Sequence, residues 1–128
     1  MENIKISITE NLIEDFAKFS GDNNPIHMDE SFASRTPFKK RIAHGTIILA
    51  KVSQLLTKEF GEGNILLTEE IKFLKPVYIG DIIELVTENI KKIKKDINEI
   101  QIVAINLKAE RVLECKATCM KIYIKNDK

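Results

Sequence analysis

Residues 45–60, GTIILAKVSQLLTKEF, form an apolar stretch that predicts a helix with almost no polar face. Seven apolar side chains lie nearly all round the helical wheel over the first twelve positions: Ile47, Ile48, Leu49, Ala50, Val52, Leu55 and Leu56. A helix of this kind is buried on most of its sides. The rest of the chain must therefore supply a surface that wraps around it.

The second half of the chain predicts four β-strands that can form this surface. Residues 64–74 alternate, with one apolar face (Ile65, Leu67, Ile71 and Phe73) and one polar face (Thr68, Glu70 and Lys72). Three more strands are expected at 81–93, 99–110 and 111–125, because these segments are rich in β-branched residues or alternate in polarity.

The connections between these strands indicate how the sheet is built. The last three strands are joined by short segments, KKDINE and AERV, so they must run antiparallel. The segment KPVYIGD (75–81) joins the first strand to them by a longer crossing. We therefore expect an α+β fold in which a curved antiparallel sheet clasps one buried helix, the architecture called a hotdog fold. Its free edge favours pairing with a second copy, so a homodimer is expected.

The totals are typical of one soluble globular domain over residues 1–128. A net charge of +1 creates no field that would recruit nucleic acid or a membrane surface. The first residues contain no apolar run of signal-peptide length, and the longest apolar run is IILA (47–50), so we expect a cytoplasmic protein. Cys115 and Cys119 lie on one predicted strand, roughly 13 Å apart, too far for a disulfide, and are interpreted as core residues.

The segment FSGDNNPIHMDE (19–30) follows a predicted helix over 9–20, which has Thr9 as its N-cap and Gly21 just past its end. Asp22, Asn24 and Pro25 are typical turn residues, so the segment can be read as a turn alone. The alternative is chemical, because a carboxylate (Asp22) and an imidazole (His27) five residues apart can converge on one water if the loop curls.

A second segment, RIAHGTIILA (41–50), brings His44 and Gly45 to the first turn of the buried helix. Free backbone N–H groups at such a position can bind an anion or a polarised oxygen, and Gly45 lets that oxygen approach closely. Gly45 can equally serve a tight entry of the helix against the sheet. The residues alone leave both interpretations open.

Taken together, these motifs resemble the MaoC-like dehydratases, which include the R-specific enoyl-CoA hydratases. The matching residues are D-x-N-P-x-H-x-D from Asp22 to Asp29, then Phe32-Ala33, then Ile42-Ala43-His44-Gly45, and then F-x-x-P-V-x-x-G-D from Phe73 to Asp81. The resemblance covers roughly residues 9–124. It implies hydration of a trans-2-enoyl-CoA to an (R)-3-hydroxyacyl-CoA, and the reverse dehydration.

The resemblance also implies roles for individual residues. Asp22 is expected to be the general base, with His27 orienting the water and relaying the proton, and the backbone N–H of Gly45 is expected to stabilise the oxyanion. Asn24 is expected to brace the loop, Asp29 to cap the next helix, and Ser53 to line the acyl pocket. His44 lies beside Gly45 among the substrate-binding candidates, where a structural role is expected rather than a catalytic one. Lys39, Lys40 and Arg41, or Lys72 and Lys75, are candidate contacts for phosphates of coenzyme A. No metal or separate cofactor is expected, and acyl carrier protein is an alternative carrier.

Three other functions have less support in the sequence. A hotdog thioesterase typically has a carboxylate on the buried helix, but residues 45–57 contain none and Glu59 lies near the far end. A non-catalytic subunit that binds acyl-CoA or acyl carrier protein would have little reason to keep both Asp22 and His27. A metal site built from Asp22, His27, Asp29 and His44 has possible ligand types, but its spacing matches no common zinc pattern.

Overall fold

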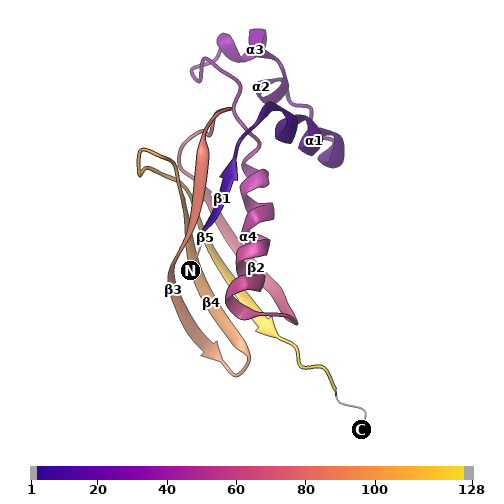
Figure 1. Ribbon diagram of the computed structural model, residues 1–128, viewed down its shortest axis with the longest axis vertical. Coiled ribbons are helices and arrows are strands. Elements are labelled where there is room, and N and C mark those ends of the chain that lie inside the picture. Colours follow the sequence, from indigo (N-terminus) through magenta and orange to yellow (C-terminus); the bar gives the residue numbers. More distant parts are fainter. Residues whose placement is uncertain (1–2, 126–128) are drawn as a thin grey trace.

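The computed structural model describes residues 3–125. The elements in chain order are β1 (Ile4–Ser7), α1 (Glu10–Ser20), α2 (Pro25–Met28), α3 (Glu30–Ser34), α4 (Gly45–Phe60), β2 (Asn64–Phe73), β3 (Ile82–Lys94), β4 (Ile97–Ile105) and β5 (Arg111–Lys121). Helix α4 lies lengthwise against the sheet, and α1, α2 and α3 gather at one end of it (Figure 1). This arrangement confirms the predicted hotdog architecture.

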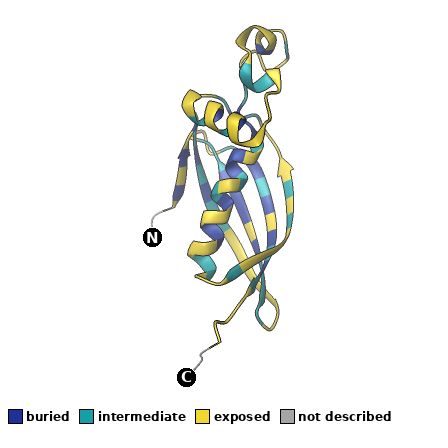
Figure 2. Cartoon of the chain, turned by 90° about the vertical axis from the view of Figure 1, so that its right-hand side faces the viewer, coloured by how far each residue is buried: buried dark blue, intermediate teal, exposed yellow. Residues whose placement is uncertain are grey.

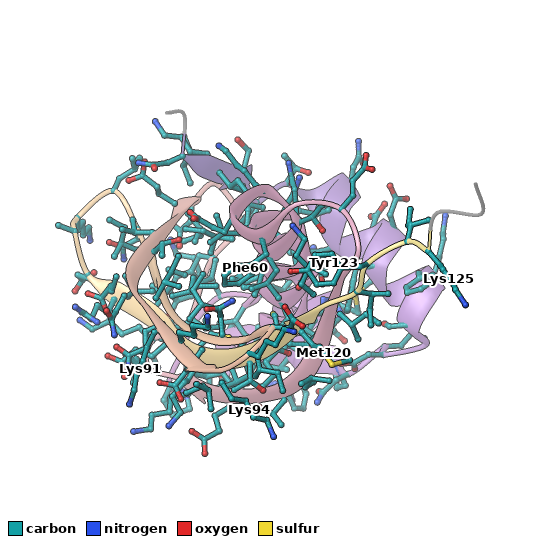
Figure 3. All side chains as sticks on the ribbon, turned by 90° about the horizontal axis from the view of Figure 1, so that it is seen from below. Phe60, Lys91, Lys94, Met120, Tyr123 and Lys125 are labelled. Atoms are coloured by element: carbon teal, nitrogen blue, oxygen red, sulfur yellow. The ribbon has the colours of Figure 1, made fainter. Side chains whose placement is uncertain are left out.

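The sheet has five antiparallel strands in the order β1-β3-β4-β5-β2. The predicted antiparallel trio is confirmed as β3, β4 and β5. The crossing after β2 carries the chain from one edge of the sheet to β3, as its length indicated. Seen from the end at which Phe60 lies, the strands curve around α4 (Figure 3). The curvature brings the concave face of the sheet against the helix.

Helix α4 has the predicted bounds, but the prediction that it is buried on most sides is wrong for the described chain. Its buried residues lie on the side that faces the sheet: Ile47, Ile48, Val52, Leu55 and Leu56. The opposite stripe, which includes Ala50 and Ser53, is exposed (Figure 2). The sheet covers one face of the helix because its two edge strands do not meet across the other.

The concave face of the sheet and the buried stripe of α4 form one core. Ile83, Ile100 and Leu113 are completely buried in it, together with Val52 of α4. Cys115 and Cys119 are buried there as free thiols, which confirms their interpretation as core residues. Burial raises the pKa of the Cys115 thiol to about 12, so it is not a thiolate at neutral pH.

Two strand predictions need correction. Strand β1 was not predicted, because its four residues are too few to stand out, although Ile4 and Ile6 alternate with exposed residues. The strand predicted over 99–110 ends at Ile105. The chain turns there because the Asn106 side-chain oxygen accepts hydrogen bonds from the backbone N–H groups of Lys108 and Glu110 at 2.9 and 3.0 Å.

The predicted apolar face of β2 is also partly wrong. A bulge between Leu66 and Thr68 changes the alternation, so Ile65 lies opposite Met120 whereas Ile71 and Phe73 lie opposite Cys115 and Leu113. Ile65 therefore lies on the convex face, away from the helix. As an edge strand, β2 leaves several of its apolar side chains exposed.

No helix within residues 3–125 is both long enough and apolar enough to cross a lipid bilayer.

Candidate active site

The loop that carries Asp22 begins where α1 ends. Thr9 caps α1 through its hydroxyl oxygen, which accepts from the Leu12 N–H at 3.1 Å, and Gly21 ends the helix in the left-handed region (φ 77°). The Asp22 side chain then folds over its own loop, with Oδ1 accepting from the Asn24 N–H at 3.1 Å. The cap and the turn therefore act together, holding one carboxylate oxygen and leaving Oδ2 free.

His27 lies on the short helix α2, which is capped by Asn24. The Asn24 side-chain oxygen accepts from the Ile26 N–H at 3.2 Å, and Pro25 occupies the first helical position, where it needs no donor. This cap is the contact through which Asn24 would brace the loop, as expected from the sequence. Because α2 turns the chain back, His27 Nε2 comes to 3.9 Å from Asp22 Oδ2.

The hydrogen bond on the other side of the His27 ring determines where its proton lies. Nδ1 is 2.8 Å from the backbone oxygen of Ile42, and a carbonyl oxygen only accepts, so the neutral ring carries its proton on Nδ1. Nε2 then presents a lone pair to Asp22 Oδ2. Two acceptors 3.9 Å apart do not form a hydrogen bond with each other, but one water between them can donate a hydrogen bond to each.

The segment just before α4 holds this loop by backbone and side-chain contacts. The Ile42 N–H donates to the Ile26 carbonyl at 3.2 Å, and Arg41 Nε donates to the His27 carbonyl at 2.6 Å. His44 Nε2 donates to the Asp22 carbonyl at 3.0 Å. The segment 41–44 therefore braces both ends of the stretch from Asp22 to His27. It is itself tied to the crossing after β2 by the Ala43 N–H, which donates to the Val77 carbonyl at 2.7 Å.

A cavity of about 520 Å³ opens beside this pair. Its polar end contains Asp22, His27, His44 and the amino end of α4 at Gly45, and its ionisable residues also include Lys75. The remaining lining is mostly apolar: Phe38, Ile42, Ala43, Ile48, Phe73, Leu74, Pro76, Val77 and Val112. Such a site suits an apolar acyl group whose reactive carbons lie next to a carboxylate and an imidazole.

Gly45 is covered by the ring of Phe73, which reaches it from β2. A Cβ atom at Gly45 would overlap this ring, with Cδ1 only 2.7 Å away. Tight packing against Phe73 therefore explains in part why residue 45 is a glycine, which agrees with the interpretation that Gly45 permits a tight entry of the helix. The first N–H groups of α4 have no acceptor within the helix, so the other interpretation, an oxyanion donor at Gly45, stays a prediction.

Of the basic residues at 39–41 that were predicted to contact phosphate, two are exposed beside the cavity and one is buried. Lys39 and Lys40 are exposed next to Phe38 of the cavity, and Lys40 lies 5.8 Å from the centre of the Tyr78 ring. The prediction for Arg41 is corrected, because its side chain is only 9% exposed and its guanidinium bonds Glu10 and the His27 carbonyl. The brace formed by Arg41 was not predicted, since Arg41 was grouped with Lys39 and Lys40 although its planar guanidinium, with several donors, suits a bond to a backbone carbonyl and a carboxylate at once.

Three other predicted residues lie outside the cavity, and a fourth lines it. Asp29 caps α3 as expected, with Oδ1 accepting from the Phe32 N–H at 3.1 Å. Ser53 lies on the exposed stripe of α4, so its role in an acyl pocket stays a prediction. Lys72 lies opposite Glu114 on the convex face of the sheet, whereas Lys75 lines the cavity and pairs with Glu110.

One possible ligand atom from each of Asp22, His27 and His44, a carboxylate oxygen and two imidazole nitrogens, lies within 4.8 Å of the other two, which raises the metal alternative again. The two rings, however, are stacked with centroids 4.0 Å apart and an interplanar angle of 28°. An imidazole binds a metal in its own plane, and the planes of stacked rings run side by side rather than converging on one ion. Asp29, the fourth residue considered, is used as a helix cap. The geometry therefore favours a water between these groups over a metal.

Comparisons with known proteins give the family of this chain. The family model described as "MaoC like domain" matches residues 2–112. The chain belongs to the MaoC-like family. The match includes both segments that build the polar end of the cavity and the strand that carries Phe73.

Relatives of this MaoC-like chain are named as hydratases and dehydratases. A 3-hydroxybutyryl-CoA dehydratase from Methylorubrum extorquens is 42% identical over 88 residues, covering 68% of this chain and 56% of the relative. An (R)-specific enoyl-CoA hydratase from Aeromonas caviae is 40% identical over 67 residues, covering 52% and 50%. The matched part of the chain thus spans about half the length of these curated relatives.

Solved structures match over more of the chain. An unliganded R-hydratase from Pseudomonas aeruginosa superposes with a TM-score of 0.85 at 30% identity, covering 98% of this chain and 85% of that structure. An (R)-hydratase from A. caviae gives a TM-score of 0.85 at 25% identity, covering 94% and 93%. The fold of the MaoC-like chain is therefore shared with R-hydratases from end to end of the described sheet.

A double substitution separates the two roles of Gly45. Gly45→Ala alone should lower kcat, because the new methyl group meets Phe73 and also narrows the approach to the helix N–H groups. In Gly45→Ala with Phe73→Leu, the clash with the ring is relieved. If the substrate must approach the Gly45 N–H, the double variant should have a kcat about 10-fold or more below that of Phe73→Leu alone. Recovery to the level of Phe73→Leu in a steady-state assay would show that Gly45 serves packing only.

Proposed function

We propose that this MaoC-like protein catalyses the R-specific hydration of trans-2-enoyl-CoA to (R)-3-hydroxyacyl-CoA, and the reverse dehydration. The observation that supports it most is the pair Asp22 Oδ2 and His27 Nε2, two acceptors 3.9 Å apart at the polar end of an apolar cavity. The R configuration rests on the relatives named (R)-specific enoyl-CoA hydratase.

The hydration step follows from the two acceptors. A water that donates one hydrogen to Asp22 and one to His27 is left with its oxygen lone pairs directed at the substrate. As this oxygen bonds to C3, Asp22 takes the proton as general base, and His27 orients the water and relays the proton. The C2–C3 double bond opens, and C2 receives a proton from the pair. General acid–base catalysis of this kind typically contributes on the order of 10²–10⁴ in rate.

The charge that develops on the thioester oxygen needs a donor. The amino end of α4 lies in the same cavity as Asp22 and His27, and its unpaired N–H groups and dipole favour a negative oxygen there. We assign this role to the Gly45 N–H. A single donor of this kind is worth about 10²–10³ in kcat in other enzymes.

The reaction requires no cofactor, since water, a base and an oxyanion donor suffice, and coenzyme A is part of the substrate. Lys39 and Lys40 are exposed and directly follow Phe38, which lines the cavity. We propose that they bind the phosphates of coenzyme A. The alternative of a thioesterase has less support. At about 1.5 Å of rise per residue, Glu59 lies roughly 20 Å along α4 from Gly45, and its carboxylate accepts from Thr87.

Substitution of the pair tests the proposal. Asp22→Asn and His27→Ala should each lower kcat for hydration of crotonyl-CoA by about 10²–10⁴, because the first removes the general base and the second removes the imidazole that orients the water. The loss of enoyl absorbance gives the rate, chiral analysis of the product gives its configuration, and a thiol reagent detects any released coenzyme A.

Asp29→Asn is the matched control. It removes a carboxylate from the same segment but outside the cavity, and asparagine caps a helix about as well as aspartate. Its kcat should stay within about threefold of the unchanged protein. Near-normal hydration by either Asp22→Asn or His27→Ala would contradict the assigned roles, and release of coenzyme A without hydration would favour the thioesterase.

We also propose that two copies pair through the edge strand β2. This strand is ten residues long, has no partner on its outer side in the sheet order, and exposes Ile65, Leu66, Leu67 and Phe73 by 40–58%. A long, apolar, exposed edge is a surface that proteins normally cover. Phe73 of the same strand lines the cavity, so the second copy would lie close to the site.

The mass in solution tests this pairing. Light scattering should give twice the chain mass of 14.6 kDa, and Leu67→Lys should shift the protein toward single chains, because a charge on an edge strand opposes pairing. Leu107→Lys is the control, since Leu107 is 77% exposed in the β4–β5 turn. A single-chain mass for the unchanged protein at high concentration would overturn the proposal.

A further inference from the structure

His44 stands directly before α4 as its N-cap residue, but it does not cap the helix. Its side chain makes no hydrogen bond to the first turn, and the residue is only 2% exposed. N-cap positions normally hold a short polar side chain that accepts from the helix N–H groups. The His44 ring is instead turned back toward the loop that carries Asp22 and His27. Capping therefore does not explain the presence of a histidine here.

The first contact of His44 is with the backbone of Asp22. Nε2 lies 3.0 Å from the Asp22 carbonyl oxygen, which only accepts, so the neutral ring carries its proton on Nε2. The Asp22 side chain is held separately, by the bond from the Asn24 N–H to Oδ1. Together these contacts fix both the backbone and one carboxylate oxygen of Asp22, leaving Oδ2 to face His27.

The second contact is with the His27 ring. The two imidazoles are stacked at 4.0 Å between centroids, and Phe16 of α1 lies behind His44 at 5.0 Å with its ring tilted by 59°. His27 is also held by its Nδ1–H bond to Ile42. One contact fixes the edge of the His27 ring and the other fixes its face, so the direction of the Nε2 lone pair is set.

The third observation concerns the other nitrogen of His44. Nδ1 is buried and has no hydrogen-bond partner among the described residues. An unpaired buried acceptor lowers stability, so a residue selected only for packing at this place would be an apolar ring. A role in the site would explain why an imidazole is present here although it weakens the fold.

We propose that His44 is a positioning residue that holds Asp22 and His27 as a pair, in a tautomer opposite to that of His27. This inference rests on the proposed function, because the pair it positions is the one that holds the water. His44 keeps its proton on Nε2 to bond the Asp22 carbonyl, and His27 keeps its proton on Nδ1 so that its Nε2 can accept from the water. Stacking of the two rings couples the two arrangements.

Two substitutions separate the contacts of His44. His44→Phe keeps a ring that can stack on His27 but removes the donor to Asp22, and His44→Gln keeps a donor near Nε2 but removes the ring. We expect His44→Phe to lower kcat by about 10–10² with KM within threefold, since a misplacement of about 1 Å can cost that much. Its melting temperature should change little, because the lost bond to the Asp22 carbonyl and the removal of the unpaired Nδ1 act in opposite directions. His44→Gln should recover part of the lost kcat.

Phe16→Leu is the control, because it removes the ring behind His44 and leaves both contacts to the pair; its kcat should be nearly unchanged. Wild-type kcat in His44→Phe would overturn the inference, and so would a loss of kcat in that variant that only follows a loss of folded protein. If Asp22→Asn and His27→Ala are inactive while His44→Phe is not, the inference alone fails. If all of them are active, the proposed function fails.

The tautomers can be measured on the unchanged protein, which keeps the inference testable even if a variant does not fold. The chain contains only two histidines, so a ¹⁵N-histidine-labelled sample shows two imidazoles, which His44→Gln or His27→Ala assigns. Long-range ¹H–¹⁵N spectra at neutral pH should show one ring protonated on Nδ1 (His27) and one on Nε2 (His44). The same tautomer on both rings would overturn the proposal.

Discussion

The site depends on one constraint, which is that the stretch before α4 holds the loop between α1 and α3 in a fixed curl. The contacts are few and specific: the Arg41 side chain to the His27 carbonyl, the Ile42 carbonyl to the His27 ring, and the His44 ring to the Asp22 carbonyl. The Ala43 N–H donates to the carbonyl of Val77, which lies in the crossing between β2 and β3. This bond holds the stretch in place relative to the sheet. The geometry of Asp22 and His27 is therefore set by the fold and not by the short helix α2 alone.

The apolar packing of α4 completes this constraint. Its buried stripe, from Ile47 to Leu56, anchors the helix on the concave face of the sheet, and its amino end is thereby held beside the pair. Phe73 closes over Gly45 from the edge strand, which leaves no room for a side chain at that position. A carboxylate, an imidazole and a helix amino end meet in one cavity because three different elements are packed on one core.

The arrangement also has a cost in stability, and this cost distinguishes a functional site from a structural one. A buried acceptor without a partner, such as His44 Nδ1, destabilises a fold by about 1–3 kcal/mol. Asp22 Oδ2 and His27 Nε2 are two acceptors that face each other, and the pair stabilises the folded chain only when a donor lies between them. A water between Asp22 and His27 removes the cost of the second feature, whereas the unpaired Nδ1 of His44 remains a cost.

Much of this could be predicted from the sequence, because it depends on local pattern. The bounds of α1 and α4, the Gly21 stop and the cap at Asp29 follow from spacing and residue type, whereas the short helix α2 was expected as a loop. The bulge in β2 could not be predicted, since one extra residue changes the alternation without changing composition. The bond between His44 and Asp22 joins residues 22 positions apart, and the partners of Arg41, Glu10 and the His27 carbonyl, are likewise distant in the sequence. Such contacts arise from tertiary packing, for which the sequence alone contains no spacing rule.

The most direct test of the account is a high-resolution crystal structure of the unchanged protein at neutral pH, without substrate. The account predicts one ordered water within hydrogen-bond distance of both Asp22 Oδ2 and His27 Nε2, with the His44 ring stacked on His27 and bonded to the Asp22 carbonyl. A direct hydrogen bond between Asp22 and His27, or side chains that point apart with no shared water, would contradict it.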